Sequence, residues 1–222
     1  MKKILIATGI VLLLLLAADI LFKEPLKQAA YDRITQGMFT DVDGDDFDTG
    51  PAIGSRFPEI TALYQGRQVG QIALFTGPRG TVFMASRSFD WCPYCIKQMI
   101  QLNENVAQFQ SAGIGLVAMT YDTPEQLAAF KEKHGIVIPM LSDIDAQTFE
   151  TLGILNADHL PGDDDYGLPY PGSMIIAPDG TIVEKVFLEA YSSRVSAGAV
   201  LALAKASLPA VSVKSSPATV NK

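Results

Sequence analysis

From Gly54 onwards, short apolar runs alternate with longer runs that have helical periodicity. The short runs predict strands and the longer runs predict helices. This alternation implies right-handed crossovers, and therefore an α/β domain with a mostly parallel sheet and helices on both faces. The turn Ala177–Gly180 predicts a closing hairpin with an antiparallel edge. The expected strands are Gln71–Phe75, Thr81–Ser86, Gly115–Tyr121, Ile136–Leu141, Ser173–Ala177 and Thr181–Phe187, and the expected helices are Pro93–Gln110, Pro124–His134, Ala146–Leu152 and Ser193–Ser207.

Length and charge limit the number of domains and the classes of partner. The 222 residues suffice for one well-buried domain with additional segments. A hydrophobic fraction of 48% predicts a packed core. The net charge of −7 would repel nucleic acids and anionic lipid surfaces, so we exclude both as partners.

The N-terminal residues have the pattern of an export sequence. Lys2 and Lys3 precede the apolar stretch Ile4–Phe22. This stretch is longer than the apolar core of a signal peptide, ~7–15 residues, and close to the ~20 residues of a spanning helix. We expect residues 1–23 to form an uncleaved single-pass anchor in the cytoplasmic membrane, with the domain in the periplasm. The alternative is cleavage, which would release the domain into the periplasm.

Three further segments follow this anchor. Residues 24–53 are expected to form a polar, acidic linker with one short helix around Leu26–Gln36. The acidic run Asp41–Asp48 does not fit a calcium loop, because the sixth and twelfth positions lack the required glycine and glutamate. Residues 54–208 form the expected domain, and residues 209–222 have no periodicity and predict a disordered tail.

The chain has two cysteines, Cys92 and Cys95. A disulfide over so short a loop is a poor structural staple, because stabilisation by a disulfide grows with loop length. A zinc site would need two more ligands, and the two histidines, His134 and His159, are the candidates that remain. We therefore expect a redox-active Cys92–Cys95 disulfide, with no metal and no other cofactor.

The cysteine motif lies where an expected strand ends and an expected amphipathic helix begins. At a helix N-terminus the free N–H groups and the helix dipole stabilise a thiolate. Cys92 is therefore expected to be the more exposed nucleophile, with a pKa below the ~8.5 of a free thiol, and Cys95 the resolving cysteine. Pro93 suits the first helical turn. The supporting residues are Trp91, which would shield the dithiol and report its redox state, Pro93 and Tyr94.

This motif and its surroundings resemble the thioredoxin-like superfamily, and within it the redoxin, or AhpC/TSA, branch. The similar segments are Gly54–Pro58, Ser88–Cys95, Tyr121–Leu127, Leu141–Asp143 and Ile175–Gly180. The resemblance implies a thioredoxin-like fold. It also implies that Pro171 is a cis-proline packed against the dithiol, where it would present backbone to a substrate.

The main hypothesis is a membrane-tethered thiol–disulfide oxidoreductase whose partners are thiol or disulfide proteins. Tyr94 stands where strong oxidants of the superfamily have a histidine, which favours a reductase. Thioredoxin-like proteins usually also bury a carboxylate six residues before the first cysteine. That position is Ser86 here, so another acid or a water molecule would take its role.

Two alternatives remain. The first is a peroxiredoxin-like thiol peroxidase. Peroxidases of the superfamily need an upstream proline and threonine and an arginine from a late strand, and the corresponding positions here are Ala85, Phe89 and Pro171. Arg87 and Ser88 are the candidates to replace them. The second alternative is a Sco-like copper-binding assembly factor, although its cysteines are spaced more widely and its late histidine lies closer to the following strand than His159 does.

Overall fold

The computed structural model describes residues 22–40, 42, 46–163 and 165–210. The expected anchor over residues 1–23 lies almost entirely outside this part, and so does most of the expected tail. Among the described residues, no helix combines the length and apolarity needed to cross a membrane.

The chain divides into two compact units, one ending at Gly37 and one beginning at Met38. In the first unit, residues 22–34 form a helix, as the sequence predicts around Leu26–Gln36. The second unit begins inside the segment expected to be a linker. There the two-residue strand β1 (Phe39–Thr40) pairs in parallel with β9 (Arg194–Val195).

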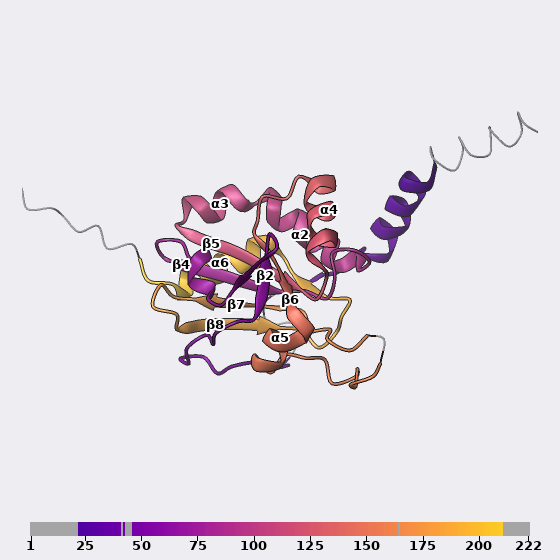
Figure 1. Cartoon of the computed structure of the whole chain (residues 1–222). Helices are drawn as coiled ribbons and strands as arrows, with labels where there is room; N and C mark the ends of the chain where they lie inside the picture. Colours follow the sequence, from indigo (N-terminus) through magenta and orange to yellow (C-terminus); the bar gives the residue numbers. More distant parts are fainter. Residues whose placement is uncertain (1–21, 41, 43–45, 164, 211–222) are drawn as a thin grey trace, which may run out of the picture. The chain divides into compact units, whose positions relative to one another are not determined.

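A seven-stranded mixed sheet forms the centre of the second unit (Figure 1). Its three middle strands run parallel to one another, and antiparallel pairs complete both edges, with strand order β3-β2-β6-β5-β4-β7-β8. The expected hairpin forms between β7 and β8. The bounds are β2 Ala62–Tyr64, β3 Arg67–Val69, β4 Gly80–Ala85, β5 Ile114–Thr120, β6 Met140–Asp143, β7 Gly172–Ile176 and β8 Ile182–Phe187.

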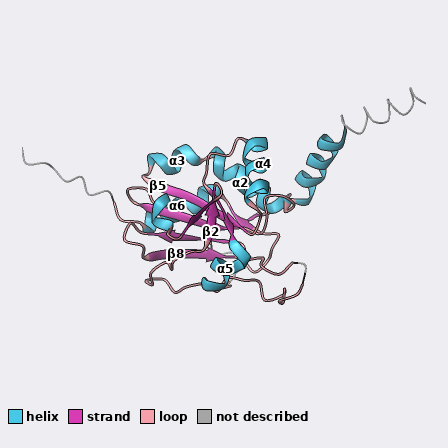
Figure 2. Cartoon of the chain, in the orientation of Figure 1, coloured by secondary structure: helices cyan, strands magenta, loops and turns pink. Residues whose placement is uncertain are grey.

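Helices cover both faces of this sheet (Figure 2). Strand β4 shows why, because its alternate side chains enter two separate hydrophobic clusters. Val82 and Met84 pack with residues of α2, α4 and α6, whereas Phe83 and Ala85 pack with residues of α5. The bounds are α2 Pro93–Glu104, α3 Val106–Ser111, α4 Pro124–His134, α5 Gln147–Thr151 and α6 Ala197–Ser207, with the 3-10 helices η1 Ile72–Phe75 and η2 Ile144–Ala146.

Several predicted bounds were wrong for local reasons. The expected strand Gln71–Phe75 is the 3-10 helix η1, since a short apolar run does not distinguish strand from helix. The expected strand Ile136–Leu141 begins only after Pro139, which has no N–H group for a sheet ladder. The long helix after Pro93 is interrupted at Asn105, whose side-chain amide donates to the carbonyl of Gln101.

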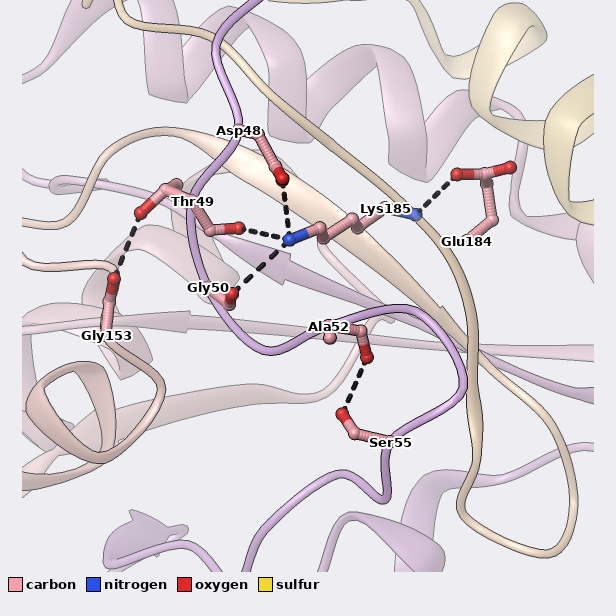
Figure 3. A network of polar contacts seen from close by, with 8 residues as sticks. All are labelled: Asp48, Thr49, Gly50, Ala52, Ser55, Gly153, Glu184 and Lys185. Carbon is pink, nitrogen blue, oxygen red and sulfur yellow. Dashed lines mark hydrogen bonds and ion pairs between the residues drawn. The ribbon is translucent and has the colours of Figure 1, made fainter.

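Residues 48–50 are fixed to β8 by the side chain of Lys185 (Figure 3). Its Nζ lies 2.6 Å from Oδ1 of Asp48, and it donates to the carbonyl oxygens of Thr49 at 2.9 Å and Gly50 at 3.3 Å. The Lys185 side chain is 10% exposed, whereas that of Asp48 is 80% exposed. The two carbonyl contacts are therefore better protected from water than the ion pair.

We predict that Lys185→Met costs about 1–3 kcal/mol of unfolding free energy, because it leaves two backbone carbonyls without their charged donor. Asp48→Ala should cost less than about 1 kcal/mol, since it removes only a solvent-screened charge. Urea unfolding of both variants tests this. Equal losses would show that the exposed ion pair, and not the carbonyl contacts, provides the stabilisation.

Candidate active site

The cysteine motif lies at a strand–helix junction, as predicted. Strand β4 ends at Ala85, a short turn follows, and α2 begins at Pro93. Cys92 is the N-cap residue of α2, and its sulfur accepts a hydrogen bond from the backbone N–H of Cys95 at 3.4 Å. Proline at the first helical position costs α2 no hydrogen bond, because that N–H has no helical partner.

The two thiols are free, and their sulfur atoms share a hydrogen bond at 2.7 Å. Both residues are buried, with Cys92 1% exposed and Cys95 0% exposed. The two thiols thus differ little in exposure, and exposure alone does not distinguish the expected nucleophile, Cys92, from Cys95. Because the sulfurs are adjacent, either cysteine can attack the other without a large movement of the backbone.

Sequence reasoning missed one residue of this site, Arg194. It is 1% exposed, and its Nη2 lies 3.0 Å from the sulfur of Cys95 and 3.9 Å from that of Cys92. Its Nη1 donates to the carbonyl oxygens of Tyr191 and Ser193, both at 2.6 Å. The guanidinium group is thus fixed on one side by backbone and faces the dithiol on the other.

Arg194 lies closer to the sulfur of Cys95 than to that of Cys92 and therefore favours a thiolate on Cys95. Burial by itself raises the pKa of Cys95, but the hydrogen bond with Cys92 and the Arg194 guanidinium outweigh it and hold that pKa well below 9.0. The hydrogen bond with Cys95 and burial raise the pKa of Cys92. When the pair loses one proton, these effects favour keeping the remaining proton on Cys92 and placing the thiolate on Cys95. The sequence-based expectation placed the lowered pKa on Cys92.

Two parts of the chain hold Arg194 in place through β9. The backbone N–H of Arg194 donates to the carbonyl of Met38 at 2.8 Å, next to β1. From α2, the side chain of Gln98 donates to the carbonyl of Val195 at 3.3 Å, and that of Gln101 accepts from the N–H of Ala197 at 2.9 Å. Helix α2, which begins at the cysteine motif, thus also hydrogen-bonds to the backbone at and just after β9, the strand that carries Arg194.

A weak signal for Arg194 is present in the sequence. It is the only charged residue between Glu189 and Lys205, in a stretch rich in alanine, serine, valine and leucine. If a charge in such a stretch is buried, it needs a partner, which makes this arginine a candidate. The expected helix Ser193–Ser207 concealed it, because α6 begins only at Ala197 and Arg194 belongs to β9.

Aromatic residues surround the outer side of the motif. The guanidinium of Arg87 lies between the rings of Trp91 and Tyr191, 5.1 Å and 4.9 Å from their centroids. The indole N–H of Trp91 donates to the hydroxyl of Tyr121 at 2.8 Å, and Tyr94 packs edge-on against Tyr191. Trp91 is 38% exposed. Arg87 thus contacts aromatic rings and does not take the place that Arg194 occupies at the sulfurs.

Pro171 lies near the site but does not have the expected conformation. No peptide bond among the described residues is cis, so the prediction of a cis-proline is wrong. Pro171 is buried and lines a small pocket together with Arg194 and Gln98. Its carbonyl accepts a hydrogen bond from the N–H of Leu188 at 3.1 Å.

The histidines of the copper and zinc hypotheses lie elsewhere in the fold. His134 ends α4 and its ring packs against Phe130, with centroids 4.7 Å apart. The backbone N–H of His159 donates to the carbonyl of Asn156 in a turn. Within the described ranges, no group of three or more histidine, cysteine, aspartate or glutamate side chains is placed to hold a metal ion.

The sequence model of the AhpC/TSA family matches residues 53–185, more than half of the chain. The chain belongs to the AhpC/TSA family. The peroxiredoxin Bcp of Escherichia coli is 31% identical over 134 residues, 60% of this chain and 83% of that protein. A peroxiredoxin-type protein of Mycobacterium tuberculosis is 31% identical over 91 residues, 41% of this chain. The match spans 57% of that mycobacterial relative.

Solved structures confirm the thioredoxin-like fold of this AhpC/TSA family member. The peroxidoxin BcpB of Mycobacterium tuberculosis superimposes with a TM-score of 0.58 at 18% identity, covering 72% of this chain and 96% of that one. Reduced Prx3 of Vibrio vulnificus gives a TM-score of 0.60 at 20% identity, covering 70% and 99%. At these identities the likeness establishes the fold.

We predict that Arg194→Met moves the first titration of the dithiol to higher pH, because a methionine cannot stabilise the Cys95 thiolate. The thiolate of the wild-type protein persists above its lowered pKa and is lost as the pH falls through it; in the variant the loss occurs at higher pH. Thiolate absorbance near 240 nm measures both midpoints. Arg87→Met is the control for a nearby charge. An unchanged midpoint in Arg194→Met would contradict the charge assignment.

Proposed function

We propose that this protein is a thiol peroxidase of the peroxiredoxin type, which reduces hydroperoxides with its dithiol. The observation that carries the proposal is the contact of the buried Arg194 with both sulfurs. A dithiol exchanger needs a thiolate, but a peroxidase also needs a cation that stabilises the oxygen leaving the peroxide. The relatives named as peroxiredoxins support the same activity.

The first step is attack by the Cys95 thiolate on the terminal oxygen of the hydroperoxide. A sulfur–oxygen bond forms and the oxygen–oxygen bond breaks, which oxidises Cys95 to a sulfenic acid and releases an alkoxide that takes a proton from solvent water to become an alcohol. Negative charge moves from the sulfur to the leaving oxygen during this step. The Nη2 of Arg194 lies 3.0 Å from the sulfur and can stabilise charge on both atoms.

The second step closes the disulfide. The sulfur of Cys92, 2.7 Å from that of Cys95, attacks the sulfenic acid. A sulfur–sulfur bond forms, the sulfur–oxygen bond breaks, and hydroxide leaves with the Cys92 proton as water. An external thiol then reduces the disulfide and restores both cysteines.

Disulfide exchange remains the second candidate, because a dithiol at the N-terminus of α2 also suits that reaction.

We further propose that residues 1–23 tether the domain to the periplasmic face of the cytoplasmic membrane, on the basis of the two lysines and the apolar stretch that follows them. Disulfide exchange and membrane tethering are both compatible with peroxidase activity. In a peroxidase cycle, another thiol protein or a small thiol in the same compartment must reduce the Cys92–Cys95 disulfide, and that reduction is itself a disulfide exchange.

The peroxidase proposal predicts fast oxidation of the reduced protein by hydrogen peroxide or an alkyl hydroperoxide. Stopped-flow fluorescence of Trp91, the one tryptophan of the chain, follows the reaction. Arg194→Met should slow the oxidation roughly 10²- to 10³-fold, as the loss of one donor to a developing oxyanion does elsewhere. Arg79→Met is the matched control, because Arg79, like Arg194, donates to backbone carbonyls but lies at the other end of β4. Wild-type oxidation no faster than that of a free thiol would leave disulfide exchange as the function.

The roles of the two cysteines can be separated with the same reagent. Cys92→Ser should still consume one equivalent of peroxide and retain a sulfenic acid on Cys95, which a 1,3-dione reagent labels and mass spectrometry locates. Cys95→Ser should react more slowly, because it removes the sulfur that lies nearer the Arg194 guanidinium. The opposite pattern would restore Cys92 as the nucleophile.

A further inference from the structure

One buried carboxylate beside the motif has no part in the chemistry proposed above. Asp122 follows the end of β5 and is 3% exposed. Its Oδ1 accepts from the hydroxyl of Ser88 at 2.6 Å, and its Oδ2 accepts from the N–H of Phe89 at 2.6 Å and the hydroxyl of Thr120 at 2.9 Å. Two of these three donors belong to the turn that leads into the cysteines.

Ser88 connects this carboxylate with the motif. Its oxygen donates to Asp122 and accepts from the backbone N–H groups of Asp90 at 3.0 Å and Trp91 at 3.3 Å. The backbone of Ser88 also forms a hydrogen bond to the Cys95 sulfur that favours the thiolate. Ser88 is fully buried. Residues 88–91 are thus organised around one carboxylate, and one end of this turn faces the reactive sulfur.

Such an arrangement is costly unless every acceptor is satisfied, because an ionised carboxylate loses its hydration when buried. Burial raises the pKa of Asp122, and the hydrogen bonds from Ser88, Phe89 and Thr120 oppose this effect. The like charge of Asp90 raises the pKa of Asp122 further, and the carboxylate of Asp90 itself accepts from the side chain of Gln126 on α4.

We propose that Asp122 is a positioning residue: it holds the Ser88–Trp91 turn so that the backbone of Ser88 stays directed at the Cys95 sulfur. Asp122 acts through Ser88 and does not contact either sulfur in any described hydrogen bond. Its effect on peroxide turnover rests on the proposed function, whereas its effect on the thiolate does not.

Two physical effects of Asp122 on Cys95 have opposite signs, and this makes the proposal testable. A carboxylate acting only through its negative charge would disfavour the thiolate, so its neutralisation would lower the pKa of Cys95. A carboxylate acting by positioning favours the thiolate, so its neutralisation would raise that pKa. The amide of an asparagine cannot accept through its nitrogen, so Asp122→Asn must lose at least one of the donors from Ser88 and Phe89.

The experiment measures the thiolate midpoint of the full-length reduced protein by absorbance near 240 nm, in Asp122→Asn, Ser88→Ala and Asp143→Asn. Asp143 is the matched control, because it is also buried, also has a raised pKa caused by burial, and accepts from the N–H groups of Thr148 and Phe149 far from the cysteines in sequence. Ser88→Ala removes the hydroxyl that joins Asp122 to the N–H groups of Asp90 and Trp91, and it leaves the Phe89 contact with Asp122 in place.

We expect the midpoint to rise in Asp122→Asn and in Ser88→Ala and to stay at the wild-type value in Asp143→Asn. If the midpoint rises by one pH unit, the thiolate fraction at a pH below the midpoint falls about tenfold. The rate of reaction with peroxide should fall in proportion. A lowered or unchanged midpoint in both Asp122→Asn and Ser88→Ala would overturn the proposal. If the midpoints rise while the wild-type protein does not react rapidly with peroxide, positioning by Asp122 stands and the proposed peroxidase activity fails. Should Asp122→Asn not fold, Ser88→Ala decides alone.

Discussion

The contact between one buried guanidinium and two thiols is the interaction on which the rest of this site depends. A buried arginine remains charged, and it needs a negative partner when water is excluded. Two carbonyls satisfy part of the Arg194 side chain, but the dithiol alone among its described hydrogen-bond partners can supply a full negative charge. Arg194 and the thiolate therefore stabilise each other. When the disulfide forms, the thiolate is consumed and this ion pair is lost. The fold thus favours the reduced state, which makes the disulfide easier to reduce.

Local and long-range effects compete for the position of the thiolate. The N-cap position of Cys92 favours a thiolate there, which is the expectation from the motif alone. Arg194 lies closer to Cys95, and a full charge at 3.0 Å in a buried site outweighs the partial charge of a helix terminus. The motif alone predicts the dithiol, whereas the proposed division of roles between its cysteines rests on a residue 99 positions from Cys95.

The sequence predicts those elements whose signals are local. Helix α4 was predicted to the residue, because Thr123 and Gln126 form a capping box and Pro124 occupies the first turn. Strands β4, β5 and β7 are strongly apolar, β8 follows the turn Ala177–Gly180, and all four were placed within one or two residues. The hairpin of β2 and β3, the pairing of β1 with β9 and the position of Arg194 were missed. These elements are two or three residues long, too short to show periodicity, and contacts across the fold define them.

The pairing of β1 with β9 also affects how relatives of this protein are compared. The family segment, residues 53–185, contains both cysteines and the sheet strands that place them, but neither Arg194 nor the strand that holds its backbone. Two chains can therefore share this segment and its dithiol while differing in whether a guanidinium reaches the sulfurs. Similarity across residues 53–185 reflects the shared fold, whereas the guanidinium that contacts the sulfurs comes from the sequence that follows this segment. Alignments that extend to both flanks are needed to group such proteins by reactivity.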